Sequence, residues 1–81
     1  MNKQTVLKAI QKAIHTTQKD EKAEVVIGVK GDVVPINFPI SKTTFVYDDD
    51  VDAIFISDSY WDMWVSIEDV SSIKIAHKRF D

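Results

Sequence analysis

Cysteine is absent from the sequence, glycine and proline occur only twice each, and no apolar run is long enough to span a membrane. Without cysteine the chain cannot form disulfides, thiolate zinc sites or a thiol nucleophile. Proteins without disulfides are typical of reducing compartments, so we expect a cytoplasmic location. Polar residues interrupt every apolar stretch well before about 18 residues, so neither a signal peptide nor a membrane contact is expected.

The composition is that of a folded chain. Hydrophobic residues make up 44% of the 81 residues, whereas disordered chains bury too little apolar surface to offset the entropy lost on folding. The sequence has no internal repeat and no linker-like stretch. Residues 1–81 are therefore expected to form one domain, which folds alone or as a homo-oligomer.

Charge is unevenly distributed along the chain. Residues 31–69 carry nine acidic side chains and a single lysine, which gives this block a net charge of −8. The thirty residues before it sum to +3 and the twelve after it to +2. Because Tyr60, Trp61 and Trp64 lie inside the acidic block, a surface of carboxylates and aromatic rings is the first candidate for contact with a partner.

The first part of the chain has the apolar spacing of an amphipathic α-helix, expected over residues 3–18. The stripe consists of Val6, Leu7, Ile10, Ala13 and Ile14. Asn2 is suited to cap the helix, because its side-chain oxygen can accept a backbone N–H of the first turn. An isolated helix of about fifteen residues is marginal in water, so the stripe must pack against the rest of the chain.

The remaining apolar residues fall in short runs that predict antiparallel strands. The runs lie at residues 24–30, 33–40, 43–47, 51–57, 60–67 and 72–77. The expected fold class is therefore α+β, with an N-terminal amphipathic helix followed by a five- or six-stranded antiparallel meander. Short strands of this kind can close into a small barrel, which removes exposed sheet edges.

Two turns set the expected strand registers. Gly31-Asp32 suits a two-residue type II′ turn, with glycine at the first position. This turn pairs Val25 with Phe38, Ile27 with Ile36, and Val29 with Val34. Pro35 and Pro39 cannot donate to a ladder, so the outer side of the second strand is expected to be a sheet edge or to end in a bend.

A two-residue loop at Asp58-Ser59 would place Ile56 opposite Trp61 and make Trp61 part of the core. Phe55 and Trp64 then lie on the opposite face. Two alternatives stay open for these rings: the helix covers them, or it packs elsewhere and leaves them exposed.

The segment Trp64-Val65-Ser66-Ile67-Glu68-Asp69-Val70-Ser71-Ser72-Ile73-Lys74-Ile75 resembles the closing segment of SH3-like and Sm-like small barrels. In those folds a strand ends in one helical turn, and a short final strand completes the ring. The N-terminal helix is similar to the Sm-like arrangement. The Sm-like resemblance implies RNA binding on a ring oligomer, but the acidic loops at 48–50 and at Asp58 would repel a phosphate backbone.

Chemical signatures of catalysis are weak. An EF-hand loop beginning at Asp48 would need glycine and glutamate where Ala53 and Ser59 stand. His15 and His77 are far apart in sequence, and neither has a partner spaced to form a relay. Two glycines cannot build a phosphate-binding loop. We therefore expect no catalytic residue, no metal, no cofactor and no enzymatic activity.

The candidate partner-binding residues combine aromatic rings with nearby carboxylates. They are Phe55, Tyr60, Asp62, Trp64, Asp48, Asp49 and Asp50. Aromatic residues with a polar rim are typical of protein-binding hot spots. The expected function is a non-enzymatic protein-interaction module that binds a protein partner or a second copy of itself.

Two alternatives remain. One is an acidic inhibitor of the kind carried by phages and mobile elements, which imitates nucleic-acid phosphates. The other is an Sm-like RNA-binding ring protein. A nucleic-acid partner is the less favoured expectation, because the middle of the chain is acidic.

Overall fold

The computed structural model describes residues 1–16 and 20–77. In chain order the elements are α1 (Lys3–Thr16), β1 (Glu24–Val29), β2 (Ile36–Pro39), the 3₁₀ turn η1 (Ile40–Lys42), β3 (Thr44–Asp48), β4 (Ala53–Ser57), β5 (Asp62–Ser66), the 3₁₀ turn η2 (Ile67–Asp69) and β6 (Val70–Ala76). The α+β class is confirmed. The predicted helix extends to residue 18, but residues 17 and 18 lie outside the described residues. The last strand ends at Ala76, one residue before its predicted end at His77.

The strands form two separate antiparallel sheets instead of one closed barrel. Within residues 1–16 and 20–77, one sheet has the order β2-β1-β6 and the other the order β3-β4-β5. After β2 the chain turns through η1, where the Thr43 hydroxyl donates a hydrogen bond to the carbonyl oxygen of Pro39 (2.6 Å). Pro39 has no N–H, so it cannot donate to a ladder at the end of β2.

Helix α1 begins as the sequence predicts. Asn2 Oδ1 accepts a hydrogen bond from the backbone N–H of Thr5 (2.9 Å), which is the expected N-cap. The N-terminal ammonium group donates to the carbonyl oxygen of Val70 (2.9 Å) and ties the start of the helix to β6. Val6, Ile10 and Ala13 are buried.

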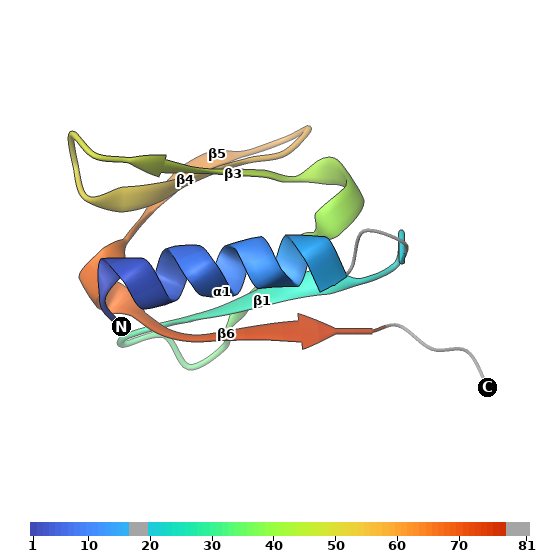
Figure 1. The fold of residues 1–81 in the computed structure, drawn as a ribbon, viewed down its shortest axis with the longest axis horizontal. Coiled ribbons are helices and arrows are strands. Elements are labelled where there is room, and N and C mark those ends of the chain that lie inside the picture. The colour runs from blue at the N-terminus through green and yellow to red at the C-terminus, as the bar shows by residue number, and fades with distance from the viewer. Residues whose placement is uncertain (17–19, 78–81) are drawn as a thin grey trace.

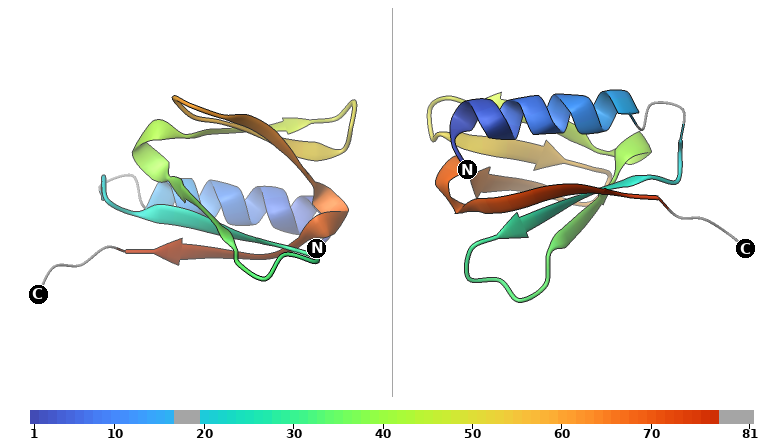
Figure 2. Two further views of the ribbon diagram at one scale, coloured as in Figure 1. Left: turned by 180° about the vertical axis from the view of Figure 1, so that it is seen from behind. Right: turned by 60° about the horizontal axis from the view of Figure 1, so that its bottom comes forward.

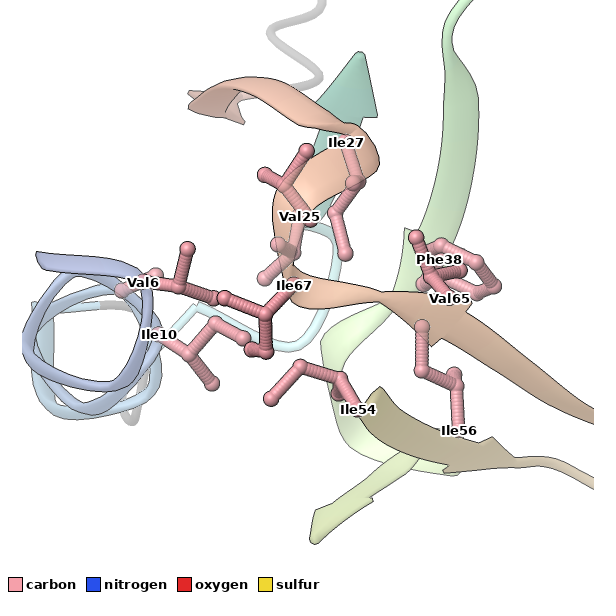
Figure 3. Close-up of a cluster of buried hydrophobic side chains, with 11 residues drawn as sticks. Val6, Ile10, Val25, Ile27, Phe38, Ile54, Ile56, Val65 and Ile67 are labelled. Atoms are coloured by element: carbon pink, nitrogen blue, oxygen red, sulfur yellow. The ribbon is translucent and has the colours of Figure 1, made fainter. Parts of the chain in front are cut away.

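The core lies between the two sheets, and α1 runs along one open side of it (Figures 1 and 2). Figure 3 shows Val6 and Ile10 of the helix pointing toward Ile54 and Ile67. Ala13 of the helix also belongs to the cluster, and the remaining side chains come from both sheets: Val25, Ile27, Phe38, Ile56, Val65 and Val70. The helix therefore packs on the inner faces of the sheets.

The first hairpin has the predicted register over part of its length. Val25 lies opposite Phe38 and Ile27 opposite Ile36, as expected. The predicted pairing of Val29 with Val34 is wrong, because β2 begins only at Ile36 and Val34 is exposed.

The end of β1 is instead held by the other neighbouring strand. Lys30 N–H donates to the carbonyl oxygen of Asp69 (2.7 Å), and Val29 pairs with Val70. The turn is closed by a bond from Asp32 N–H to the carbonyl oxygen of Val29 (3.1 Å). Gly31, with φ of 86°, is the third residue of this turn. It does not occupy the first position of a type II′ turn.

The second hairpin is shifted by two residues from the predicted register. Ile56 lies opposite Met63, and Phe55 lies opposite Trp64. The loop is longer because the carboxylate of Asp58 accepts bonds from the backbone N–H groups of Tyr60 (2.7 Å) and Trp61 (2.8 Å). An even shift preserves which residues share a face. It does, however, move Trp61 out of the sheet and into the turn, so the prediction that Trp61 is a core residue is wrong.

Candidate functional site

A row of apolar side chains crosses the outer face of the β3-β4-β5 sheet. Val46, Phe55 and Trp64 are paired across the three strands, and we call them the apolar row. Helix α1 lies on the other side of this sheet (Figure 1). Trp64 is 55% exposed and Val46 is 52% exposed, while Phe55 is half-buried between them. The helix therefore does not cover the apolar row.

Trp64 is held in one orientation by its neighbours. Its ring lies 4.8 Å from the ring of Phe55, at an interplanar angle of 48°. Its indole Nε1–H donates a hydrogen bond to Asp48 Oδ2 (3.0 Å). The other oxygen of Asp48 accepts a bond from the backbone N–H of Asp50 (3.1 Å), so the carboxylate is itself oriented. A side chain that is already ordered loses less entropy when a partner binds it.

Rows that each end in a carboxylate flank the apolar row on both sides. On one side Asp48, Ala53 and Ser66 lie opposite one another across the strands. On the other side, Asp62 accepts a hydrogen bond from the Ser57 hydroxyl (2.5 Å). The outer face therefore has an apolar centre with carboxylates on two opposite corners, at Asp48 and Asp62.

The predicted site residues do not all come together. Phe55, Trp64, Asp48 and Asp62 share the outer face. Tyr60 is 87% exposed, but it lies in the turn that joins β4 to β5.

Asp49 and Asp50 lie in the turn that joins β3 to β4. Consecutive turns of an antiparallel meander lie at opposite ends of the sheet. Tyr60 and the pair Asp49 and Asp50 therefore lie at opposite ends and do not form one contact surface.

Val46 was not among the residues predicted from the sequence. The signal that could have found it is strand alternation, since Phe45 and Tyr47 point to the core side.

The turn after β3 is locked by polar contacts. The Tyr47 hydroxyl donates to Asp52 Oδ1 (2.7 Å). This bond, together with desolvation and the nearby carboxylates, raises the pKa of Tyr47 to about 12. The Lys3 ammonium lies 4.3 Å from the centre of the Tyr47 ring, within the range of a cation–π contact. Asp52 adopts a positive φ of 51° and is committed to this turn.

The three consecutive aspartates also bring oxygen atoms together. Ligand atoms of Asp48, Asp49 and Asp50 lie within 4.8 Å of one another, and carboxylate oxygens suit hard cations such as Ca²⁺. Both oxygens of Asp48 already accept hydrogen bonds, from the Trp64 indole and the Asp50 backbone. The hydrogen bonds of Asp48 therefore serve to orient the Trp64 ring.

Comparisons with protein families, with curated proteins and with solved structures found no match to the chain. Of the helical segments in the described ranges, none has the length and apolar character needed to cross a membrane.

Proposed function

We propose that the chain is a non-enzymatic protein-interaction module that binds a partner through the outer face of the β3-β4-β5 sheet. The observation that carries this function is the apolar row, in which Trp64 is half exposed yet ordered by Phe55 and Asp48. An exposed aromatic anchor with a polar rim has the composition of a binding hot spot. Asp48 and Asp62 provide the rim.

The charge of the face favours a basic partner. Residues 31–69, which include the whole β3-β4-β5 sheet, carry nine acidic side chains against Lys42 alone. Complementary charge steers association and suppresses partners of like charge. The partner surface is therefore expected to present an apolar pocket for Trp64 beside arginine or lysine side chains.

The test is affinity capture with the purified chain as bait, comparing wild type with Trp64→Ala and Trp61→Ala. The matched control is informative because Trp61 is 73% exposed but lies in the turn, off the outer face. Wild type and Trp61→Ala should retain the same bound protein, and Trp64→Ala should lose it. Equal capture by all three baits, or no specific capture by wild type, would count against the proposed surface.

We propose that the order of elements is related to that of SH3-like and Sm-like folds, although the two sheets of the described residues do not close into a barrel. Support comes from residues 64–75, which run from β5 through the helical turn η2 into β6, in the order that the resemblance implies. We do not extend this relation to RNA binding, because Asp48 and Asp62 would face the phosphates on the outer face.

Mimicry of nucleic-acid phosphates is the second candidate, and the acidic block favours it. A competition experiment with duplex DNA distinguishes phosphate mimicry from the proposed protein-interaction module. Duplex DNA added to the captured complex should release a DNA-binding partner held by phosphate mimicry, and should leave other basic partners bound.

A further inference from the structure

The outer edge of β3 has backbone groups without a strand partner among the described residues. In the second hairpin, bonds from Asp58 N–H to the carbonyl of Trp61 and from Ile67 N–H to the carbonyl of Asp52 fix which residues of β4 face β5. Hydrogen-bonded and non-hydrogen-bonded pairs alternate along an antiparallel ladder. The even-numbered residues of β4 therefore bond to β5, and the odd-numbered ones bond to β3.

This alternation continues into β3. Its register with β4 pairs Val46 with Phe55, so the even-numbered residues of β3 bond inward to β4. The N–H and C=O groups of Phe45 and Tyr47 then point away from the sheet. Within the described part of the chain, β3 has no second neighbour to receive them.

The edge at β2 is protected, in contrast. The bond from Ile40 N–H to the carbonyl of Ala23 sets the alternation there, and it turns the backbone of residues 35, 37 and 39 outward. Pro35 and Pro39 have no N–H, and the Pro39 carbonyl is occupied by the Thr43 hydroxyl. Proline on an edge strand blocks pairing with another chain. The free edge of β3 carries no proline.

An apolar groove runs beside this unprotected edge, between β3 and α1. Its volume is about 340 Å³, and its lining includes Leu7 and Ile14 of the helix and Phe45 and Tyr47 of the strand. Ile14 is 39% exposed although it belongs to the apolar stripe of the helix. The free edge and the groove together form a slot for an added strand whose inward side chains are apolar.

We infer that the occupant is β3 of a second copy of this chain, paired antiparallel across a two-fold axis. Full overlap of the five-residue strand places Thr44 opposite Asp48 of the second copy and centres the pair on Val46. In this register Phe45 lies opposite Tyr47 of the second copy. These are the residues whose backbone groups point outward, so donors and acceptors match without any shift.

The same register is complementary in side chains. Val46 meets Val46 of the second copy on the outer face, as a β-branched pair. The two apolar rows then join into one stripe across six strands. Phe45 and Tyr47 of the second copy point inward, toward the groove lined by Leu7 and Ile14.

Charge favours this register as well. Lys42, the single lysine of the acidic block, precedes β3 by two residues, and Asp48 ends the strand. The antiparallel register therefore puts the lysine end of β3 in one copy beside the acidic end of β3 in the other. It also keeps the two Asp48 carboxylates apart, at opposite ends of the pair. The interface is small, so the dimer should be weak and should depend on protein concentration.

The dimer goes beyond the proposed partner binding, and the two can fail separately. Trp64 lies on β5, which β4 separates from the β3 edge. Trp64→Ala should therefore abolish partner capture and leave dimerisation intact.

The first experiment measures dimerisation by sedimentation velocity over a range of concentrations. Wild type should shift from monomer to dimer as concentration rises. Val46→Lys sets two like charges directly opposite and should weaken the dimer by about tenfold or more. Val33→Lys is the matched control, because Val33 is exposed in the loop between β1 and β2, away from β3. Monomeric wild type at every concentration, or a dimer unaffected by Val46→Lys, would overturn the inference.

The second experiment tests the register by disulfide cross-linking. The chain has no cysteine of its own, so any disulfide must involve the introduced residue. In the inferred pairing, Val46→Cys places two thiols across a non-hydrogen-bonded pair, about 4.5 Å apart at Cα, which a disulfide can span. Thr44→Cys leaves its two thiols about 13 Å apart along the strands. Mild oxidation should give a covalent dimer for Val46→Cys only. Equal cross-linking of both variants, or none for Val46→Cys, would refute this register.

Discussion

Substituting Gly28 by alanine tests the close approach of β1 and β6. Gly28 lies opposite Ser72, at a shift in the register of the two strands. A Cβ added at Gly28 would collide with the Ser72 hydroxyl and would lie 3.0 Å from the Ser71 hydroxyl. Gly28 does not adopt a positive φ, so the backbone itself tolerates alanine. The expected cost is therefore steric.

The magnitude follows from two opposing terms. Overpacking a well-packed site costs about 1–3 kcal/mol. Replacing glycine by alanine in a tolerant conformation returns about 0.4–1 kcal/mol by restricting the unfolded chain. Because the colliding atoms are serine hydroxyls that can rotate about χ1, the cost lies at the lower end of the overpacking range, and a net loss of about 0.5–1 kcal/mol is expected. For a domain of this size, each 1 kcal/mol lowers Tm by roughly 4–8 °C.

Ser72→Ala in the Gly28→Ala background tests the assigned cause. It deletes the colliding hydroxyl and leaves the Ser72 Cβ at 3.6 Å, an ordinary contact distance. The double variant should recover most of the loss, so the two substitutions should be strongly non-additive. Urea denaturation at constant m-value supplies the free energies. Additive effects, or a Gly28→Ala variant as stable as wild type, would refute the steric account.

Three further predictions concern stability and pH. Ile54 is 1% exposed beneath α1, so Ile54→Ala should cost about 2–5 kcal/mol in urea denaturation. The hydrogen bond with His77, followed by the bond from Lys22 N–H, lowers the pKa of Asp20 below 3.8. The stability from Asp20 is present above that value and lost as pH falls further, so an acid titration of Asp20→Asn should fall less steeply than that of wild type. Tyr47, with its pKa raised from 10.0 to about 12, contributes stability below pH 10 that is lost as pH rises toward 12. Tyr47→Phe should be less stable than wild type below pH 10, and the difference in unfolding free energy should shrink as pH rises toward 12. Urea denaturation midpoints measure this difference.

Side-chain alternation was the most reliable signal in the sequence. The pairing of Val25 with Phe38, predicted from a turn at Gly31-Asp32 and consistent with the apolar pattern, is confirmed, although the turn itself differs. In the second hairpin the loop is two residues longer on the β5 side than predicted, yet Phe55 and Trp64 still share the outer face. A face is preserved by any even shift, so it can be predicted even where the pairing partners cannot.

Loop length was not predictable, because it depends on hydrogen bonds of single side chains. The carboxylate of Asp58 could equally have been solvated in a two-residue loop. Instead it accepts two backbone N–H bonds and enlarges the turn, which expels Trp61 from the core. The turn after Pro39 is likewise stabilised by a single side chain, because the Thr43 hydroxyl donates to the Pro39 carbonyl oxygen.

The candidate site was predicted in part. Strand alternation predicts that Phe55 and Trp64 share a face, and the charge pattern adds Asp48, but their mutual contacts required the register of three strands. Tyr60 was grouped with them because it is near Trp64 in sequence. Nearness in sequence does not predict a shared surface at a turn. Tyr60 lies in the turn before β5, whereas Trp64 lies within β5.

The two exposed tryptophans explain why the contact surface is assigned to the sheet rather than to the turn. Trp61 is more exposed than Trp64. Within residues 1–16 and 20–77, its indole N–H has no hydrogen-bond partner corresponding to Asp48. A ring without such a contact loses more rotamer freedom when a partner binds, at about 0.5–1.5 kcal/mol per side chain. Trp64 has largely met this cost on folding, through its contacts with Phe55 and Asp48. Asp48→Asn should therefore weaken partner binding less than Trp64→Ala, because an amide oxygen can still accept the indole bond.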